Sequence, residues 1–361
     1  MEQIEDLTGM LDLIVQPAFC VQNGAVSQVN FAAQRCLIEV GTPVGKLLKT
    51  GKQEYQEFSG GCLYLMLSLS GESWGASVTR MNGFDVFLLE QEDKKEDLQA
   101  MALAAQQLRR PLTGIMTLAD QLFPMVGVGE DPDIADQVAR INRNLFQLLR
   151  VVSNMSDAYR YTQEAAGRKE TRDICGILEE IFSKAAPLVQ HAGIELRYSI
   201  PRESVYCLVD AEMLERAVNN ILSNAIKFTP RGGWIDANLK RRGKILYLTV
   251  QDNGSSVSEK LRGNVFSRFQ RGPGLEDSRY GIGLGMVLIR SAAARHGGTV
   301  LMEYPKEGGT RITLTVATQQ NKDPIVCSRI MKVDYAGERD HQLIELSDTL
   351  PVTLYESGKI N

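Results

Sequence analysis

Two asparagines and a lysine have the types and the spacing of a nucleotide site. Asn220, Asn224 and Lys227 stand four and three residues apart, so on a helix the two carboxamides lie one turn apart on a single face. Together they offer oxygen ligands to a hard cation and a positive charge to the phosphates that accompany it. Such a pair is by itself more often solvated or directed into a helical bundle, so the hypothesis depends on the rest of the chain.

The surrounding sequence predicts the helix that these side chains need. Asp210 stands where an N-cap residue would accept a hydrogen bond from the first turn. Apolar residues recur at steps of three and four between Leu214 and Ala225, so they form one stripe that can be buried.

Two further segments follow this helix in the same domain-sized region. Asp252-Asn253-Gly254 comes after an alternating run, 245–250, that predicts a strand, and the glycine-rich run 281–285 opens an apolar helical pattern. A helix with two asparagines, a strand that leads into Asp-x-Gly and a glycine run therefore occur in that order. This order resembles the ATP-binding domain shared by sensor histidine kinases, gyrase-type ATPases and related chaperones.

The resemblance implies a role for each matching residue and implies ATP and Mg²⁺ as cofactors. It makes Asn224 the magnesium ligand and puts Asn220 and Lys227 near the phosphates. It also puts Phe228 beside the adenine and makes Asp252 the carboxylate that accepts a hydrogen bond from the adenine amino group.

Glycines supply the remaining edge of the implied pocket. They comprise Gly254 and the run that contains Gly281, Gly283, Leu284 and Gly285. The run would let backbone amides approach the phosphates at a helix N-terminus, where the helix dipole favours anions. Its spacing differs from the dinucleotide-binding fingerprint. Ser256 stands where the family usually has a second glycine, and its side chain would narrow the mouth of the pocket or stiffen the loop.

Two long helical patterns precede this domain. Apolar residues step by three and four from Leu98 to Leu122 and from Ile134 to Tyr159, with a break at 124–132 that is rich in proline and glycine. Two such helices predict an antiparallel hairpin. Because one hairpin cannot bury both stripes well, we expect two chains to pair into a four-helix bundle, so that the protein is a homodimer.

The first of these helices resembles the phosphoacceptor segment of histidine kinases, including its Pro111, but the acceptor is absent. The family's histidine is Gln106 here, and its acidic neighbour is Gln107. A carboxamide nitrogen is no comparable nucleophile, because its lone pair is delocalised into the carbonyl. Arg110 takes the position that orients water for phosphatase activity, and a guanidinium cannot accept a hydrogen bond.

The three histidines lie outside the hairpin. His191 and His296 stand at expected helix ends, a position typical of cap residues, and His341 lies in the polar C-terminal region. None of them is placed to replace the missing acceptor.

The remaining sequence indicates a multidomain α+β chain. Residues 1–92 have a strand-strand-helix-strands order similar to that of a PAS sensor domain, although a small dimerisation module without a ligand would show the same pattern. The hairpin takes 93–165 and the α/β sandwich ATP-binding domain takes 166–318. The extension 319–361 has no family match, and we expect either a docking element for a partner or an extra layer on the sheet.

Composition narrows the function classes. The chain is 43% hydrophobic and 23% charged, with a formal net charge of -4, which gives no polycationic surface for nucleic acid. The six cysteines form no Cys-x-x-Cys pair, which favours reduced core thiols over metal ligands. No apolar run is long enough to cross a bilayer, and no signal-type apolar core follows the N-terminus. We therefore expect a cytoplasmic protein without a membrane span.

Three hypotheses follow from the sequence. In the first, the chain binds ATP but does not phosphorylate itself, and nucleotide shifts a lid at 255–280 and the hairpin between arrangements that a partner such as a response regulator detects. In the second, it is an active phosphotransferase whose acceptor lies in a histidine-containing partner. In the third, it is a nucleotide-free dimeric scaffold. The retained pocket residues weigh against the third hypothesis, and the missing histidine weighs against self-phosphorylation.

Overall fold

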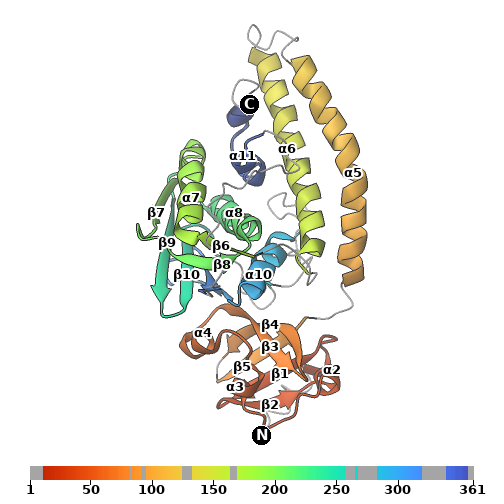
Figure 1. The fold of residues 1–361 in the computed structure, drawn as a ribbon, viewed down its shortest axis with the longest axis vertical. Coiled ribbons are helices and arrows are strands. Elements are labelled where there is room, and N and C mark those ends of the chain that lie inside the picture. Colours follow the sequence, from red (N-terminus) through yellow and green to blue (C-terminus); the bar gives the residue numbers. More distant parts are fainter. Residues whose placement is uncertain are drawn as a thin grey trace.

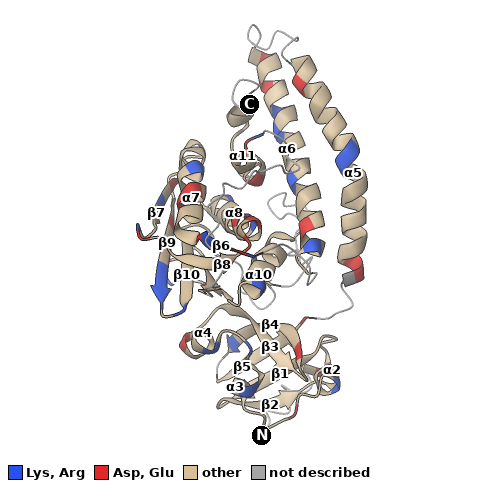
Figure 2. Ribbon diagram, viewed as in Figure 1, with Lys and Arg blue, Asp and Glu red and all other residues tan. Residues whose placement is uncertain are grey.

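The computed structural model describes residues 11–81, 83–90, 95–123, 132–162, 169–256, 265–266, 283–318 and 339–356. Figure 1 shows an N-terminal sheet at one end of the molecule, two long helices along one side, and an α/β part packed against the inner helix. Basic and acidic residues are interspersed along these elements (Figure 2), with a basic run at residues 240–242.

The N-terminal part is a five-stranded antiparallel sheet with short helices. Its strands are β1 (Ala18–Gln22), β2 (Ala25–Val29), β3 (Cys62–Leu69), β4 (Glu72–Met81) and β5 (Phe84–Leu89), in the order β2-β1-β5-β4-β3. Asn23 and Gly24, between β1 and β2, both have positive φ, as a two-residue hairpin turn requires. Helices α2 (Phe31–Arg35), α3 (Val44–Leu47) and α4 (Lys52–Glu57) connect β2 to β3. The last two are too short to show a helical period, so the sequence did not predict them.

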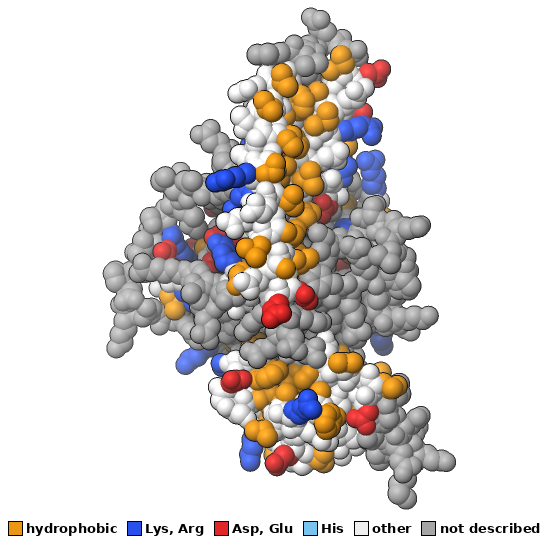
Figure 3. Space-filling model, turned by 90° about the vertical axis from the view of Figure 1, so that its right-hand side faces the viewer, with side chains coloured by type: hydrophobic (Ala, Val, Ile, Leu, Met, Phe, Trp, Pro, Cys, Tyr) orange, Lys and Arg blue, Asp and Glu red, His pale blue; other side chains and the backbone are white. Residues whose placement is uncertain are grey.

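Two long helices, α5 (Lys95–Leu122) and α6 (Pro132–Arg160), lie side by side (Figure 1). Their facing side chains, such as Leu112, Met116, Leu145 and Leu149, are buried. A second row of apolar side chains remains exposed and runs along the hairpin (Figure 3). This exposed stripe comprises Leu103, Leu108, Ile115, Leu118, Leu122, Ile141 and Leu148.

The α/β part supplies the scaffold of the candidate site. Its elements are β6 (Glu170–Asp173), α7 (Ile174–His191), β7 (Glu195–Ser199), β8 (Tyr206–Val209), α8 (Ala211–Phe228), β9 (Trp234–Arg242), β10 (Ile245–Asp252), α10 (Gly285–Arg295), β11 (Val300–Glu303) and β12 (Arg311–Ala317). The sheet order is β11-β12-β10-β9-β7, and β6 pairs with β8 apart from it. The helices cover one face of this sheet, and α10 and α8 lie between it and α6 (Figure 1).

The two sheets are joined edge to edge. Strand β3 pairs antiparallel with β11, with Leu63 opposite Leu301 and Tyr64 opposite Val300, which makes one ten-stranded sheet. A Cβ on Gly61 would lie 2.1 Å from the Met302 carbonyl oxygen, so the close approach of the two edges requires glycine there. The sequence predicted separate domains and gave no sign of this pairing.

The C-terminal segment, defined as residues 339–356, packs on helices. Helix α11 (His341–Glu345) and the 3-10 helix η3 (Val352–Tyr355) lie against α6 and α8 (Figure 1). Of the two roles predicted for the extension, the extra layer on the sheet is therefore wrong for this segment. The rest of the extension, 319–338 and 357–361, lies outside the described residues.

Candidate nucleotide-binding site

Helix α8 is fixed at its start by the cap that the sequence predicted. The Asp210 carboxylate accepts a hydrogen bond from the Met213 N–H at 3.1 Å, and the Asp210 N–H donates to Nε2 of His296 at 2.9 Å. His296 is the predicted C-cap residue of α10. Because its Nε2 accepts, its Nδ1 donates to the Ala292 carbonyl at 2.7 Å, and the ring is neutral. Burial lowers the pKa of His296 to about 4. The imidazole therefore locks α10 to α8.

The side chains of Asn220 and Asn224, both on α8, lie next to the start of α10. Asn220 is 2% exposed and donates from Nδ2 to the Arg216 carbonyl at 2.8 Å. A Cβ added to Gly285 would lie 3.0 Å from Asn220 Oδ1, so the first residue of α10 touches that oxygen. Asn224 Nδ2 lies 3.8 Å from Met286 Sδ. The structure thus brings the predicted asparagines and the end of the glycine run together.

Asp252 ends β10 as a buried carboxylate. Its Oδ1 accepts hydrogen bonds from the N–H groups of Gly254 at 2.9 Å and Thr310 at 3.2 Å. Burial raises the pKa of Asp252, and these two hydrogen bonds oppose that rise. Among the described residues both bonds end on Oδ1, which leaves Oδ2 for a further donor. Such a carboxylate marks a candidate ligand site.

The loop after β10 crosses the end of α8. A Cβ on Gly254 would lie 2.1 Å from the Phe228 carbonyl oxygen, and the Ser255 N–H donates to that oxygen at 3.0 Å. Lys227 lies at the same helix end, with Nζ 6.0 Å from the centroid of the Phe228 ring. Lys227, Phe228 and the Asp252–Gly254 loop are therefore neighbours.

Ser256 fastens this loop. Its hydroxyl donates to the Gly309 carbonyl at 2.7 Å. Gly309 has a φ of 82°, and a Cβ there would lie 1.9 Å from the Asp252 carbonyl oxygen. The hydroxyl is thus held by the chain that precedes β12, which corresponds to the stiffening expected of this residue.

The glycine run is described from Gly283 onward. Gly283 has a φ of 76°, Leu284 is the N-cap of α10 and is buried, and Gly285 is the first helical residue. Gly281 lies outside the described residues, as does most of the expected lid. Of the lid, Phe266 is buried 5.9 Å from the Tyr64 ring, centroid to centroid.

The sequence did not reveal two buried arginines that tie this site to other parts of the chain. The first, Arg290 on α10, donates to the Phe266 carbonyl at 2.9 Å and forms an ion pair with Glu90 at the end of the N-terminal part. Burial lowers the pKa of Arg290. Tyr64 completes the cluster by donating to Glu90 at 2.9 Å.

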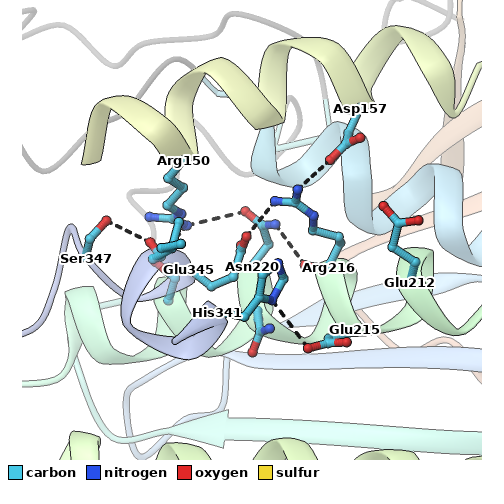
Figure 4. A network of polar contacts seen from close by, with 12 residues as sticks. Arg150, Asp157, Glu212, Glu215, Arg216, Asn220, His341, Glu345 and Ser347 are labelled. Carbon is cyan, nitrogen blue, oxygen red and sulfur yellow. Dashed lines mark hydrogen bonds and ion pairs between the residues drawn. The ribbon is translucent and has the colours of Figure 1, made fainter. Parts of the chain in front are cut away.

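The second arginine, Arg216 on α8, joins three helices (Figure 4). It is 1% exposed and pairs with Asp157 of α6 at 3.0 Å and with Glu345 of α11 at 2.5 Å. Burial raises the pKa of Asp157, while Arg216 and Arg160 oppose the rise. Nearby, Gln342 donates to Asn219 at 2.8 Å. The available signal was an arginine one turn before Asn220, but its partners are distant in sequence.

The residues at the acceptor position lie away from this site. Gln106, Gln107 and Arg110 are exposed on α5, and α5 lies on the far side of α6 from the α/β part (Figure 1). Among the described residues, no group of three or more His, Cys, Asp or Glu is placed to hold a metal ion, and no helix could cross a membrane. The five described cysteines are free thiols.

Residues 209–320 match the family described as histidine kinase-, DNA gyrase B-, and HSP90-like ATPase. The chain is 25% identical to the sensor protein KdpD of Clostridium acetobutylicum over 238 residues, which cover 62% of this chain and 26% of that protein. It is 24% identical to the sensor histidine kinase WalK of Bacillus subtilis over 245 residues, which cover 66% of this chain and 39% of that protein. The chain thus spans less than half the length of these relatives.

A solved structure has a similar fold. Full-length ShkA in complex with AMPPNP matches with a TM-score of 0.50 and 22% identity over 62% of this chain and 47% of that chain. With the site described above, these similarities show that the chain carries a histidine kinase-type ATPase domain and is homologous to sensor histidine kinases.

Proposed function

We propose that the chain binds ATP with Mg²⁺ between α8, the loop after β10 and the start of α10, and signals through this binding without phosphorylating itself at position 106. One observation carries the proposal: Asn220 and Gly285, 65 positions apart in the sequence, are in contact at the start of α10.

The residues present fit this cofactor. Asn224 supplies an oxygen for the metal, and Lys227 supplies positive charge for the phosphates. Asp252 offers Oδ2 to the adenine amino group. A Cβ added to Gly254 or to Gly309 would collide with the backbone next to this carboxylate, so both positions require glycine. ATP, when bound, supplies concentrated negative charge and a transferable phosphoryl group.

Calorimetric titration of Mg²⁺–ATP into the full chain tests the proposal. We expect saturable binding that disappears without Mg²⁺ and weakens at least tenfold in Asn224→Ala and in Asp252→Ala, since each change removes a direct ligand. Asp236→Ala, an exposed change on β9, is the control and should bind as the wild type does. No binding at millimolar nucleotide would support the scaffold hypothesis instead.

A phosphotransferase that acts on another protein is the second candidate function, because Asn220, Asn224, Lys227 and Asp252 are retained in the pocket while the acceptor position is Gln106. Labelled ATP distinguishes the two. Acid-labile label on a response regulator or on a histidine-containing partner favours the second candidate. Absence of label from every partner favours a protein that signals by binding ATP without transferring its phosphoryl group.

The hairpin favours a homodimer as the working assembly. The exposed stripe defined above is a continuous apolar surface (Figure 3), and burying it against a second copy would remove it from water. Sedimentation should show that Ile115→Glu dissociates the dimer, whereas Gln121→Glu, an exposed polar position on α5, leaves it intact.

The N-terminal part is proposed to be a PAS-like sensor domain at 1–92, followed by the dimerisation hairpin at 93–165 and the ATP-binding domain at 166–318. The strand order β2-β1-β5-β4-β3, with three short helices between β2 and β3, supports this assignment. Its contact with α10 through Glu90 and Arg290 gives a direct route from sensor to pocket.

A further inference from the structure

Arg150 of α6 reaches from the hairpin to the edge of the candidate pocket. Its side chain is buried, and one terminal nitrogen, Nη2, lies 3.0 Å from Ser223 Oγ and 3.5 Å from Asn220 Oδ1 (Figure 4). Its other terminal nitrogen, Nη1, forms an ion pair with Asp348 of the C-terminal segment. One guanidinium therefore connects the pocket to that segment.

The surroundings of Asn220 Oδ1 favour an anion. Arg150 approaches this oxygen from one element, and the first residue of α10 touches it from another. The N-terminus of this eleven-residue helix adds partial positive charge from the N–H groups of its first turn. Arg150 Nε is buried and, within the described part of the chain, has no hydrogen-bond partner. An unsatisfied buried donor is costly, and a phosphate oxygen is the kind of acceptor that would satisfy it.

We propose that Arg150 is a phosphate ligand of the bound nucleotide and that Asp348 competes with the nucleotide for it. This inference rests on the proposed function, because it requires ATP in the pocket. The phosphates and the Asp348 carboxylate are both negative and share one guanidinium, so each weakens the hold of the other. The C-terminal segment is then an internal inhibitor of nucleotide binding, and by linkage nucleotide loosens the segment.

Other contacts hold the segment independently of Arg150. Arg143 donates to the carbonyls of Ser347 at 3.1 Å and Asp348 at 3.2 Å, and Asn142 donates to the Tyr355 carbonyl at 3.0 Å. These contacts do not involve Asn220. Nucleotide is therefore expected to loosen the segment without releasing it fully.

The dissociation constant of Mg²⁺–ATP, measured by calorimetry on the full chain, tests the inference. Arg150→Met should weaken binding roughly tenfold or more, as expected for a lost charge-assisted hydrogen bond. Asp348→Asn should strengthen binding about two- to fivefold, because this carboxylate is partly exposed and its ion pair is correspondingly weak. In the Arg150→Met background, Asp348→Asn should have no further effect.

Arg143→Met is the matched control, since it loosens the same segment from the same helix without removing a proposed ligand. It should strengthen binding slightly, opposite in sign to Arg150→Met. Hydrogen exchange of the 341–355 amides should also rise when Mg²⁺–ATP is added. Binding that is unchanged or tighter in Arg150→Met would overturn this inference alone. Absence of binding by the wild type would instead overturn the proposed function.

Discussion

Helices α8 and α5 both carry segments that resemble parts of a histidine kinase, but their surroundings differ. On α8 the side chains of Arg216 and Asn220 are buried and are held by partners from α6 and α11. On α5 the side chains of Gln106 and Gln107 are exposed. A change on α8 therefore alters both folding and chemistry, whereas a change at position 106 alters chemistry alone. The pocket is retained where the fold also depends on it.

The largest expected effect is on α8. Arg216→Met leaves Asp157 and Glu345 buried with less opposite charge, so the free energy of unfolding should fall by about 3 to 5 kcal/mol. Urea denaturation followed by circular dichroism measures it. The control is Arg140→Met, which breaks an exposed pair with Asp136 on α6 and should cost less than about 1 kcal/mol. Equal losses of unfolding free energy in the two variants would contradict the contrast between buried and exposed ion pairs.

The contact that locks α10 to α8 should make stability depend on pH. The pKa of His296 is lowered to about 4 in the folded protein, so the unfolded chain binds a proton there first as pH falls below about 6.5. Stability should therefore fall by about 2 kcal/mol between pH 7 and pH 5 from this group. His296→Gln should reduce the loss, and the exposed His191→Gln should not. An unchanged pH dependence in His296→Gln would contradict the buried neutral ring.

The contact between the N-terminal part and α10 should be weaker. A Cβ on Gly75 would lie 2.2 Å from Tyr64 Oη and 2.5 Å from Glu90 Oε2, so Gly75→Ala displaces the partners of Arg290. Thermal unfolding should report a loss of about 1 to 3 kcal/mol. Gly45→Ala meets nothing within 4 Å and should be nearly neutral. A neutral Gly75→Ala would show that the cluster can shift without cost.

The smallest change in stability is expected on α5. Gln106→His combined with Gln107→Glu should alter the free energy of unfolding by less than about 0.5 kcal/mol, because both positions are exposed. The same variant should acquire acid-labile label from labelled ATP, which the wild type should not. If the variant folds and binds ATP but stays unlabelled, more than the acceptor pair has been lost.

Local features could be predicted from the sequence, and partners distant in the sequence could not. The Asp210 cap and the two long helices α5 and α6 follow from local chemistry and apolar spacing, and the structure has them. The pairing of β3 with β11 rests on backbone hydrogen bonds, which leave no mark on side-chain pattern. Likewise, a sequence shows the charge of Arg150 but not that Asp348 will meet it 198 residues later. The candidate site could be predicted because its residues stand in short motifs that can be recognised in the sequence.

Equilibrium dialysis of the wild type against γ-labelled ATP and Mg²⁺, followed by denaturation of the protein, tests the central claim most directly. We predict magnesium-dependent label on the folded protein and none after denaturation, as for a pocket that binds nucleotide without a histidine acceptor. Absence of bound label, or label that survives denaturation in an acid-labile bond, would contradict the account.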